Sequence, residues 1–288
     1  MAQQIPVDSD AIAKSIDEGG THEVMPDVVY QRLAIVNVVY YGGPSASEWV
    51  LIDTGVMGSA GAIRRAATKR FGENARPAAI IQTHGHFDHV GALEELAEAW
   101  DVPVYAHPLE IPYLAGKASY PPPDPSVGGG MMARMSPLYP RGPVDVSDRL
   151  HELPADGSVP SMPGWRWVHA SGHTPGQVAL WRESDRVLIA ADAIVTTAQE
   201  SAYAVVRQKP ELHGPPMYYT QDWESAAETV RRLAALEPEV VITGHGRAME
   251  GDEMRAALHA LARDFETVAV PKDGKYVKEP ARGDSAYR

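Results

Sequence analysis

The sequence contains no cysteine among its 288 residues. This absence excludes disulfide bonds and thiolate metal ligands, so a metal site here must use histidine and carboxylate side chains. The chain also lacks any run of 18 apolar residues, and its first ten residues have neither the basic nor the apolar region of an export signal. We therefore expect a cytoplasmic protein with no membrane partner.

The chain also has few basic residues: it contains 26 Lys and Arg but 38 Asp and Glu, which gives a formal net charge of −12. The basic residues are dispersed, whereas a protein that binds phosphate backbones needs a basic stripe. This argues against a nucleic-acid partner and leaves a small molecule as the expected substrate. The hydrophobic content of 44% suffices for a substantial core in one large or two small domains.

Histidine is concentrated in one place. The run from His84 to His89 reads His-Gly-His-Phe-Asp-His and directly follows an apolar, strand-like segment at 78–83. Two residues spaced as His-x-His at a strand end point to one face and can bind one cation together. Asp88 and His89 precede a helical pattern at 90–100 and are expected to face away from the first pair. The run thus offers two adjacent half-sites, each short of ligands.

Three other strand-like runs end in residues that could complete such sites. His173 lies in Gly-His-Thr-Pro-Gly after one run, Asp192 follows the next, and His245 lies in Gly-His-Gly after the last. Glycine beside the two histidines allows turns and close backbone approach. His169 is the alternative to His173, but its position inside a strand makes His173 the better candidate. The remaining histidines are interpreted as surface or packing residues: His22, His107, His151, His213 and His259.

With these motifs in order, the chain resembles the metallo-β-lactamase-fold superfamily, and its glyoxalase II-like branch in particular. The motifs are the Leu-Ile-Asp-Thr-Gly turn at 51–55, the His84–His89 run, and the three later ligands, and the resemblance extends from about Val28 to Phe265. It implies an α/β fold, a four-layer αββα sandwich with loop insertions over the active site. It also implies a ligand set for two metal ions: His84, His86 and His173 for the first, Asp88, His89 and His245 for the second, and Asp192 as the bridge.

The resemblance implies a hydrolase in which a metal-bridging hydroxide attacks an ester-like carbonyl, of the lactone or thioester class. Asp192 would be catalytic as the bridge, and Asp88 as a proton shuttle. Asp53 would orient a ligand histidine, or instead cap the helix that follows it. Nitrogen and oxygen ligands suit zinc, which we prefer, but also iron and manganese. The alternatives are a mononuclear iron enzyme resembling sulfur dioxygenases and, less favoured, a β-lactamase or phosphodiesterase.

Periodicity predicts strands alternating with helices, as in an α/β protein. The expected organisation is an N-terminal extension at 1–27, a hydrolase domain at 28–265 and a tail at 266–288. Within the domain the strands are expected at 32–41, 49–53, 78–83, 102–106, 165–170, 177–181, 187–191 and 240–243, and the helices at 59–71, 90–100, 222–236 and 251–265.

Two insertions interrupt this alternation, the first at 109–144 and the second at 196–221. Long segments of this kind in compact domains usually act as lids or binding walls. We predict that their apolar side chains line the substrate pocket and favour an acyl or lactone-bearing substrate; the candidates are Met131, Met135, Tyr139, Tyr218 and Tyr219. The alternative is that these side chains form a homodimer contact or a local core.

Overall fold

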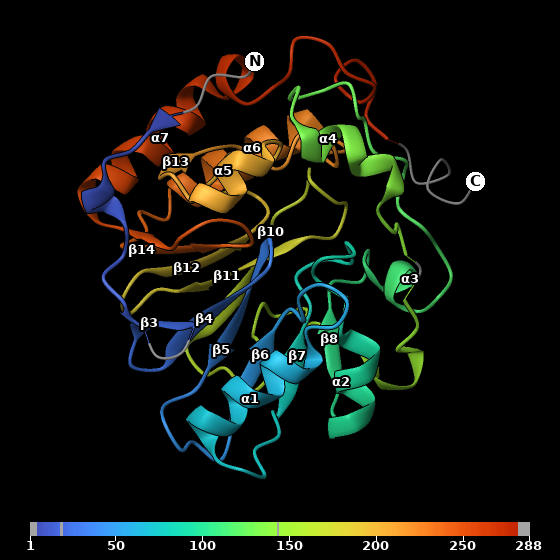
Figure 1. The fold of residues 1–288 in the computed structure, drawn as a ribbon, viewed down its shortest axis with the longest axis vertical. Coiled ribbons are helices and arrows are strands. Elements are labelled where there is room, and N and C mark those ends of the chain that lie inside the picture. The colour runs from blue at the N-terminus through green and yellow to red at the C-terminus, as the bar shows by residue number, and fades with distance from the viewer. Residues whose placement is uncertain (1–4, 18–19, 143, 282–288) are drawn as a thin grey trace. The chain divides into compact units, whose positions relative to one another are not determined.

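The computed structural model describes residues 5–17, 20–142 and 144–281. The chain divides into two compact units. Unit 1 comprises Met1–Ala13, Tyr120–Pro140 and Val168–Arg288, and unit 2 comprises Lys14–Ser119 and Arg141–Trp167. Figure 1 shows the elements with the labels used below.

Unit 2 contains a mixed sheet of eight strands that follow one another in chain order. The pairing is antiparallel from β2 to β6 and parallel from β6 to β9. The strands are β2 (Ile16–Asp17), β3 (Thr21–Met25), β4 (Val28–Leu33), β5 (Val36–Tyr41), β6 (Val50–Ile52), β7 (Ala79–Ile81), β8 (Val104–Ala106) and β9 (Leu150–Glu152).

Helices α1 (Ala60–Phe71) and α2 (Leu93–Trp100) pack against one face of this sheet (Figure 1). Each helix buries residues three and four positions apart, because these positions share one face of a helix. In α1 they are Ala60, Ile63, Ala67 and Phe71. The central strands β6 and β7 are buried on both faces, and both read as continuous apolar runs. A short helix, α3 (Ile111–Leu114), and a 3₁₀ turn, η3 (Ser147–Arg149), complete the unit.

Unit 1 is built around a second mixed sheet, of order β10-β11-β12-β14-β15, and a small sheet that pairs β1 with β13. One hydrophobic core joins β11, β12 and β14 to helices α6 and α7. The strands are β1 (Ile5–Pro6), β10 (Trp165–His169), β11 (Val178–Arg182), β12 (Val187–Ala191), β13 (Glu211–Leu212), β14 (Val240–Thr243) and β15 (Met249–Glu250). The helices are η1 (Ser9–Ala11), α4 (Met131–Met135), η2 (Ser136–Leu138), α5 (Ala202–Arg207), α6 (Trp223–Ala234) and α7 (Gly251–Val268).

Most predicted elements occur within a few residues of their expected bounds, but the single strand expected at 32–41 is wrong. Two strands, β4 and β5, form a hairpin there, and Ala34 at its turn has a φ of 58°. An apolar run without glycine or proline hides such a turn from periodicity. Strands β2 and β3 lie inside the predicted N-terminal extension, and the first insertion contributes to both units.

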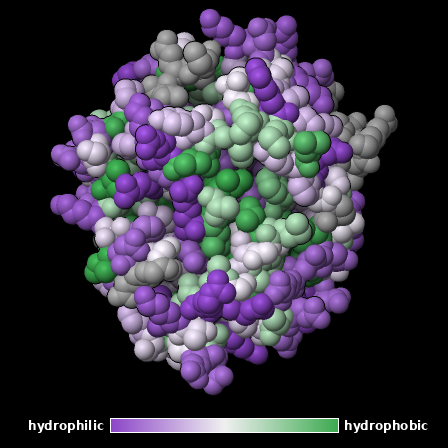
Figure 2. Space-filling view, viewed as in Figure 1, coloured by the Kyte–Doolittle hydropathy of each residue, from purple (hydrophilic) through white to green (hydrophobic). Residues whose placement is uncertain are grey.

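Figure 2 shows a mostly hydrophilic surface on which hydrophobic residues gather near the middle of the view. Several large apolar side chains are exposed, among them Met131, Met135 and Leu138 of the first insertion. Across the described ranges, 5–17, 20–142 and 144–281, no helix is both long and apolar enough to span a lipid bilayer.

Candidate functional site

The His84–His89 run of unit 2 forms a buried loop between β7 and α2. His84, His86, Asp88 and His89 are at most 6% exposed. A tight turn brings them together, because the backbone N–H of His89 donates to the carbonyl of His86 (2.9 Å). The ring centroids of His84 and His89 are 4.1 Å apart, and those of His84 and His86 are 4.9 Å apart. The expectation that His89 faces away from the first pair is therefore wrong.

Asp53, at the end of β6, contacts this loop directly. Its Oδ2 lies 2.8 Å from Nδ1 of His89 and accepts a hydrogen bond from the Thr83 hydroxyl (2.8 Å). Its Oδ1 accepts from the backbone N–H of Thr83 (2.8 Å). A carboxylate only accepts, so the His89 Nδ1–H donates and Nε2 is the nitrogen left for a metal. Asp53 does not cap α1, whose N-cap is Ser59. The geometry thus matches the orienting role.

Two further buried residues support the same loop, and sequence reasoning did not find them. The Gln82 amide donates to Asp53 Oδ1 (2.8 Å) and to the carbonyls of His84 (2.9 Å) and His89 (3.1 Å). Glu110 is fully buried, and its Oε2 accepts from the backbone N–H of Gly85 (3.1 Å). Gln82 could have been suspected as the polar end of an apolar run. Glu110 carries no local signal, since it lies 25 residues away in the first insertion.

In unit 1, parallel strands place Asp192 beside His245. Strand β12 pairs with β14 so that Ala191 lies opposite Thr243, with an irregularity after Ile189. The residues that follow the two strands therefore leave the same edge of the sheet. Asp192 Oδ2 lies 3.0 Å from His245 Nε2, and both side chains are 2% exposed.

His173 joins this pair from the turn between β10 and β11. Its Nε2 lies 3.5 Å from Asp192 Oδ2, and its Nδ1 lies 3.4 Å from the Thr220 hydroxyl. Asp192 thus contacts both His173 and His245, the two histidines of unit 1 that were predicted as ligands. His169, the alternative to His173, bonds through Nε2 to the carbonyl of Pro175 (2.8 Å) and takes no part in this set.

Glycine is required beside both His173 and His245. A Cβ on Gly172 would lie 2.4 Å from the backbone nitrogen of Ala226, and one on Gly246 would lie 2.2 Å from the Thr196 hydroxyl. Both glycines also have positive φ, 126° and 100°. The turns that carry His173 and His245 can therefore pack closely against α6 and the second insertion only with glycine at these positions.

The predicted pocket residues differ in their surroundings. Tyr218 and Tyr219 are buried, their ring centroids are 5.0 Å apart, and they immediately precede Thr220, the neighbour of His173. Met131 and Met135 are 58% and 43% exposed, and the Tyr139 hydroxyl donates to the sulfur of Met132 (3.6 Å). The tyrosines of the second insertion thus directly precede a residue that contacts His173, and their own contact with a substrate stays a prediction.

The histidines interpreted as surface or packing residues have contacts of that kind. His22 stacks on Tyr30, His151 contacts Tyr105 and His107 contacts Trp167; His213 pairs with Glu211 and His259 with Glu237.

All seven side chains predicted as ligands are buried, and they are of only two chemical types, imidazole and carboxylate. Such groups are the ordinary ligands of zinc, iron and manganese. Burying so many ionisable groups without a cation is costly. The donor chemistry therefore fits divalent metal ions. Below, the ligand candidates of unit 2 are called the unit 2 set (His84, His86, Asp88, His89), and those of unit 1 are called the unit 1 set (His173, Asp192, His245).

Comparison with known proteins identifies the class. Residues 32–245 match the metallo-beta-lactamase superfamily, so the chain belongs to that superfamily. It has the metallo-β-lactamase fold, α/β with two mixed sheets and flanking helices, as predicted from the sequence motifs. The chain is a metallo-hydrolase of this superfamily.

The chain is similar to several individual proteins and solved structures. "Probable metallo-hydrolase YflN" of Bacillus subtilis is 47% identical over 255 residues, which cover 88% of this chain and 97% of the relative. "Probable metallo-hydrolase YybB" of the same species is 26% identical over 196 residues, covering 68% and 74%. The crystal structure of TTHA1623 in a di-iron-bound form is 25% identical, with a TM-score of 0.52, covering 82% of this chain and 96% of that one. The metallo-beta-lactamase family protein TTHA1429 from Thermus thermophilus is 19% identical with a TM-score of 0.58, covering 84% and 80%.

Proposed function

We propose that the chain is a dinuclear metal-dependent hydrolase of the glyoxalase II-like branch that cleaves an ester-like carbonyl of the lactone or thioester class. The observation that carries this proposal is the pair of buried His/Asp sets at sheet edges. In this proposal His84, His86 and His173 would hold one ion, and Asp88, His89 and His245 would hold the second; both groups are buried and could each hold a metal ion. Asp192 would serve both ions.

The metal is proposed to be zinc, with iron or manganese as alternatives. Imidazole and carboxylate ligands accept all three. The di-iron form of TTHA1623 supports a dinuclear site and is the reason why iron stays an alternative to zinc. Elemental analysis decides this point.

When bound, two divalent ions would lower the pKa of water towards neutrality and polarise a substrate carbonyl. The chain's own residues prepare for this chemistry. Asp53 fixes the ring of His89 through Nδ1, and Gln82 holds Asp53 and the loop carbonyls in place. Asp88 is proposed to pass a proton to the leaving atom, because a carboxylate among the ligands can alternate between acceptor and donor.

The substrate is proposed to be a small molecule with an apolar acyl portion. Tyr218 and Tyr219 lie beside the neighbour of His173, and the first insertion supplies Met131, Met135 and Tyr139. Aromatic and methionine side chains favour apolar groups over strongly charged ones.

The test is elemental analysis of the purified protein together with hydrolysis assays on lactones, thioesters, phosphodiesters and β-lactams. We expect about two metal ions per chain and turnover of a lactone or thioester that stops when a chelator removes the metal. Oxygen uptake with a persulfide substrate and one iron per chain would instead support the dioxygenase alternative. Full activity in metal-free protein would overturn the proposal.

A further inference from the structure

Two short helices of unit 1 and the turn beside them carry most of the exposed large apolar side chains. Of the eight such side chains among the described residues, five lie in α4, η2 and α5; they are Met131, Met135, Leu138, Tyr203 and Val206. In Figures 1 and 2, which share one view, both helices face the viewer, and hydrophobic residues gather on that face. Single exposed apolar residues are ordinary, whereas a group of them marks a contact surface.

Each helix exposes one face that combines two apolar side chains with one arginine. In α4 the exposed residues are Met131, Arg134 and Met135. In α5 they are Tyr203, Val206 and Arg207. Residues three and four positions apart share a helix face, so the apolar and cationic side chains of each helix lie on one side. The inner sides are buried through Ala133 in α4 and Val205 in α5.

The two helices begin next to each other because Glu200 contacts both. Its carbonyl accepts from the backbone N–H of Met132 (3.1 Å), and the next residue, Ser201, caps α5 by accepting from the N–H of Ala204 (3.3 Å). A Cβ on Gly130 would lie 1.8 Å from the Glu200 carbonyl oxygen, so only glycine allows this approach. The exposed faces therefore form one surface, called the apolar patch below; it comprises Met131, Arg134, Met135, Leu138, Tyr203, Val206 and Arg207.

The charge of the apolar patch is opposite in sign to that of the whole protein. The sequence has no Asp or Glu at 125–144 or at 201–210, although its net charge is −12. Among the described residues neither Arg134 nor Arg207 forms an ion pair; Arg207 instead donates to the Tyr203 hydroxyl (3.2 Å) and lies over that ring. A third cation, Lys209, is already balanced by Glu211 (2.7 Å). Two positive charges thus remain without a carboxylate beside exposed apolar side chains.

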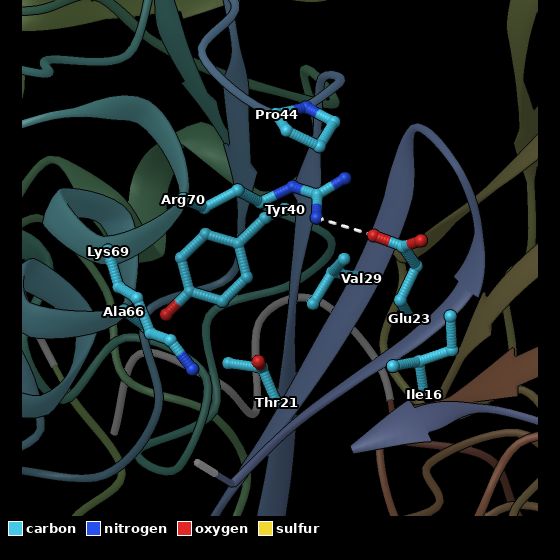
Figure 3. Close-up of a pocket in the computed structure, with 9 residues that line it drawn as sticks. All are labelled: Ile16, Thr21, Glu23, Val29, Tyr40, Pro44, Ala66, Lys69 and Arg70. Carbon is cyan, nitrogen blue, oxygen red and sulfur yellow. Dashed lines mark hydrogen bonds and ion pairs between the residues drawn. The ribbon is translucent and has the colours of Figure 1, made fainter. Parts of the chain in front are cut away.

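An exposed apolar side chain of unit 2 has different surroundings. Ile16 lines a hollow between α1 and β3, which Figure 3 shows. The arginine of that hollow, Arg70, pairs with Glu23 (2.7 Å), and the dashed line in Figure 3 marks this contact. Its charge is therefore balanced inside the protein. The arginines of the apolar patch can instead take their counter-charge from outside the chain.

From this arrangement we propose that the apolar patch contacts an anionic lipid surface. The apolar side chains enter the head-group region, and the two arginines bond to lipid phosphates, since a guanidinium fits a phosphate with two parallel hydrogen bonds. The expectation of no membrane partner rested on the lack of a long apolar run. A peripheral contact needs no such run and is compatible with the absence of a spanning helix from the described ranges.

The experiment measures co-sedimentation of the purified full-length protein with phosphatidylglycerol vesicles, and with phosphatidylcholine vesicles for comparison. We expect binding to the anionic vesicles, and binding at least about tenfold weaker to the zwitterionic ones. The double variant Arg134→Gln/Arg207→Gln should bind phosphatidylglycerol about 25-fold more weakly, because each arginine near an anionic surface contributes about fivefold. Arg65→Gln/Arg76→Gln removes two exposed arginines of unit 2 and should bind normally.

A second double variant, Leu138→Ser/Val206→Ser, tests the apolar part of the contact. It should weaken binding to phosphatidylglycerol by at least about tenfold, because two apolar side chains no longer leave water on binding. Ile16→Ser is the matched control for an exposed apolar residue of unit 2 and should bind normally. Met131 and Met135 are left unchanged, since they also belong to the proposed substrate pocket.

Equal binding to the two kinds of vesicle, or no binding of folded wild-type protein to phosphatidylglycerol, would overturn the proposal. Patch variants that bind as well as the wild type would overturn it too. A second copy of the chain could cover the apolar patch instead, and sedimentation equilibrium without lipid tests this case. A dimer that Leu138→Ser/Val206→Ser dissociates would overturn the lipid contact, whereas a monomer agrees with it. Melting temperatures confirm that each variant is folded, and vesicle binding does not depend on the proposed hydrolase activity.

Discussion

The unit 2 and unit 1 sets use the same ligand chemistry but are held in different ways. The unit 2 set comes from six consecutive residues, and a carboxylate outside the predicted ligands, Asp53, fixes one of its rings. The unit 1 set is spread from His173 to His245, and its own carboxylate, Asp192, is the partner of both histidines. A compact motif gathers its ligands locally and is oriented by carboxylates from elsewhere in the chain. A dispersed set depends on the sheet to bring its members together.

The largest effect that this comparison predicts is for Asp192→Asn. The substitution keeps the size but removes the charge that both histidines of the unit 1 set contact, so metal binding and hydrolysis should fail together. We expect loss of metal and a fall in rate on the order of 10³-fold, the upper range for removing one electrostatic group. Metal content by mass spectrometry and the hydrolysis assay are measured side by side.

The matched control is Glu211→Gln, which also removes a buried carboxylate of unit 1 but one that pairs with Lys209 and His213. It should retain metal and activity. Normal metal content and turnover in Asp192→Asn would show that the unit 1 carboxylate is not a ligand.

The sequence predicted the unit 2 set more fully than its surroundings. Spacing alone gathers His84, His86 and His89, and the strand that ends before them is apolar enough to recognise. The sense of the turn was missed, because one hydrogen bond from His89 to the His86 carbonyl decides it. Glu110 was missed because nothing near it in the chain connects it to Gly85.

For the unit 1 set, the strands were predictable and their order was not. Strand β12 lies beside β14, although α5, β13 and α6 separate them in the chain. Only that pairing puts Asp192 next to His245. Periodicity found both strands within their bounds, while the neighbour relation came from the family resemblance. Likewise the turn at Ala34 was missed because no glycine or proline marks it.

An intermediate effect is expected from the residues that support the unit 2 set. Asp53→Asn removes the charged acceptor of His89 Nδ1 and should weaken metal affinity about 10- to 100-fold. Glu110→Gln keeps an oxygen for the Gly85 N–H and should have a smaller effect. Metal affinities from competition with a chromogenic chelator rank the two variants. Equal affinity in wild type and Asp53→Asn would mean that the ring of His89 is oriented without this carboxylate.

The smallest expected effect is on the free energy of unfolding, and it comes from a substitution where the C-terminal segment supports the unit 1 set. The backbone N–H of Ala281 donates to Gln221 (2.9 Å), whose own N–H donates to Gly172 (3.0 Å), the residue before His173. The same segment is anchored at Asp124, which accepts from the backbone N–H of Lys275. The unit 1 set is therefore supported by contacts with distant parts of the chain.

Asp124 makes this support pH-dependent. Burial alone would raise the pKa of its carboxyl, but hydrogen bonds from Ser126 and Lys275 outweigh burial and hold that pKa below its usual value of 3.8. A carboxyl whose pKa is lowered on folding stabilises the fold above its unfolded pKa, and this contribution disappears as the pH falls through the folded pKa. Asp124→Asn should therefore cost about 1 kcal/mol of unfolding free energy at pH 7 and progressively less below about pH 4. Urea unfolding at several pH values measures the difference, with Asp273→Asn, an exposed carboxylate of the same segment, as the control. A difference that stays constant down to about pH 3 would show that the hydrogen bonds of Asp124 do not depend on its charge.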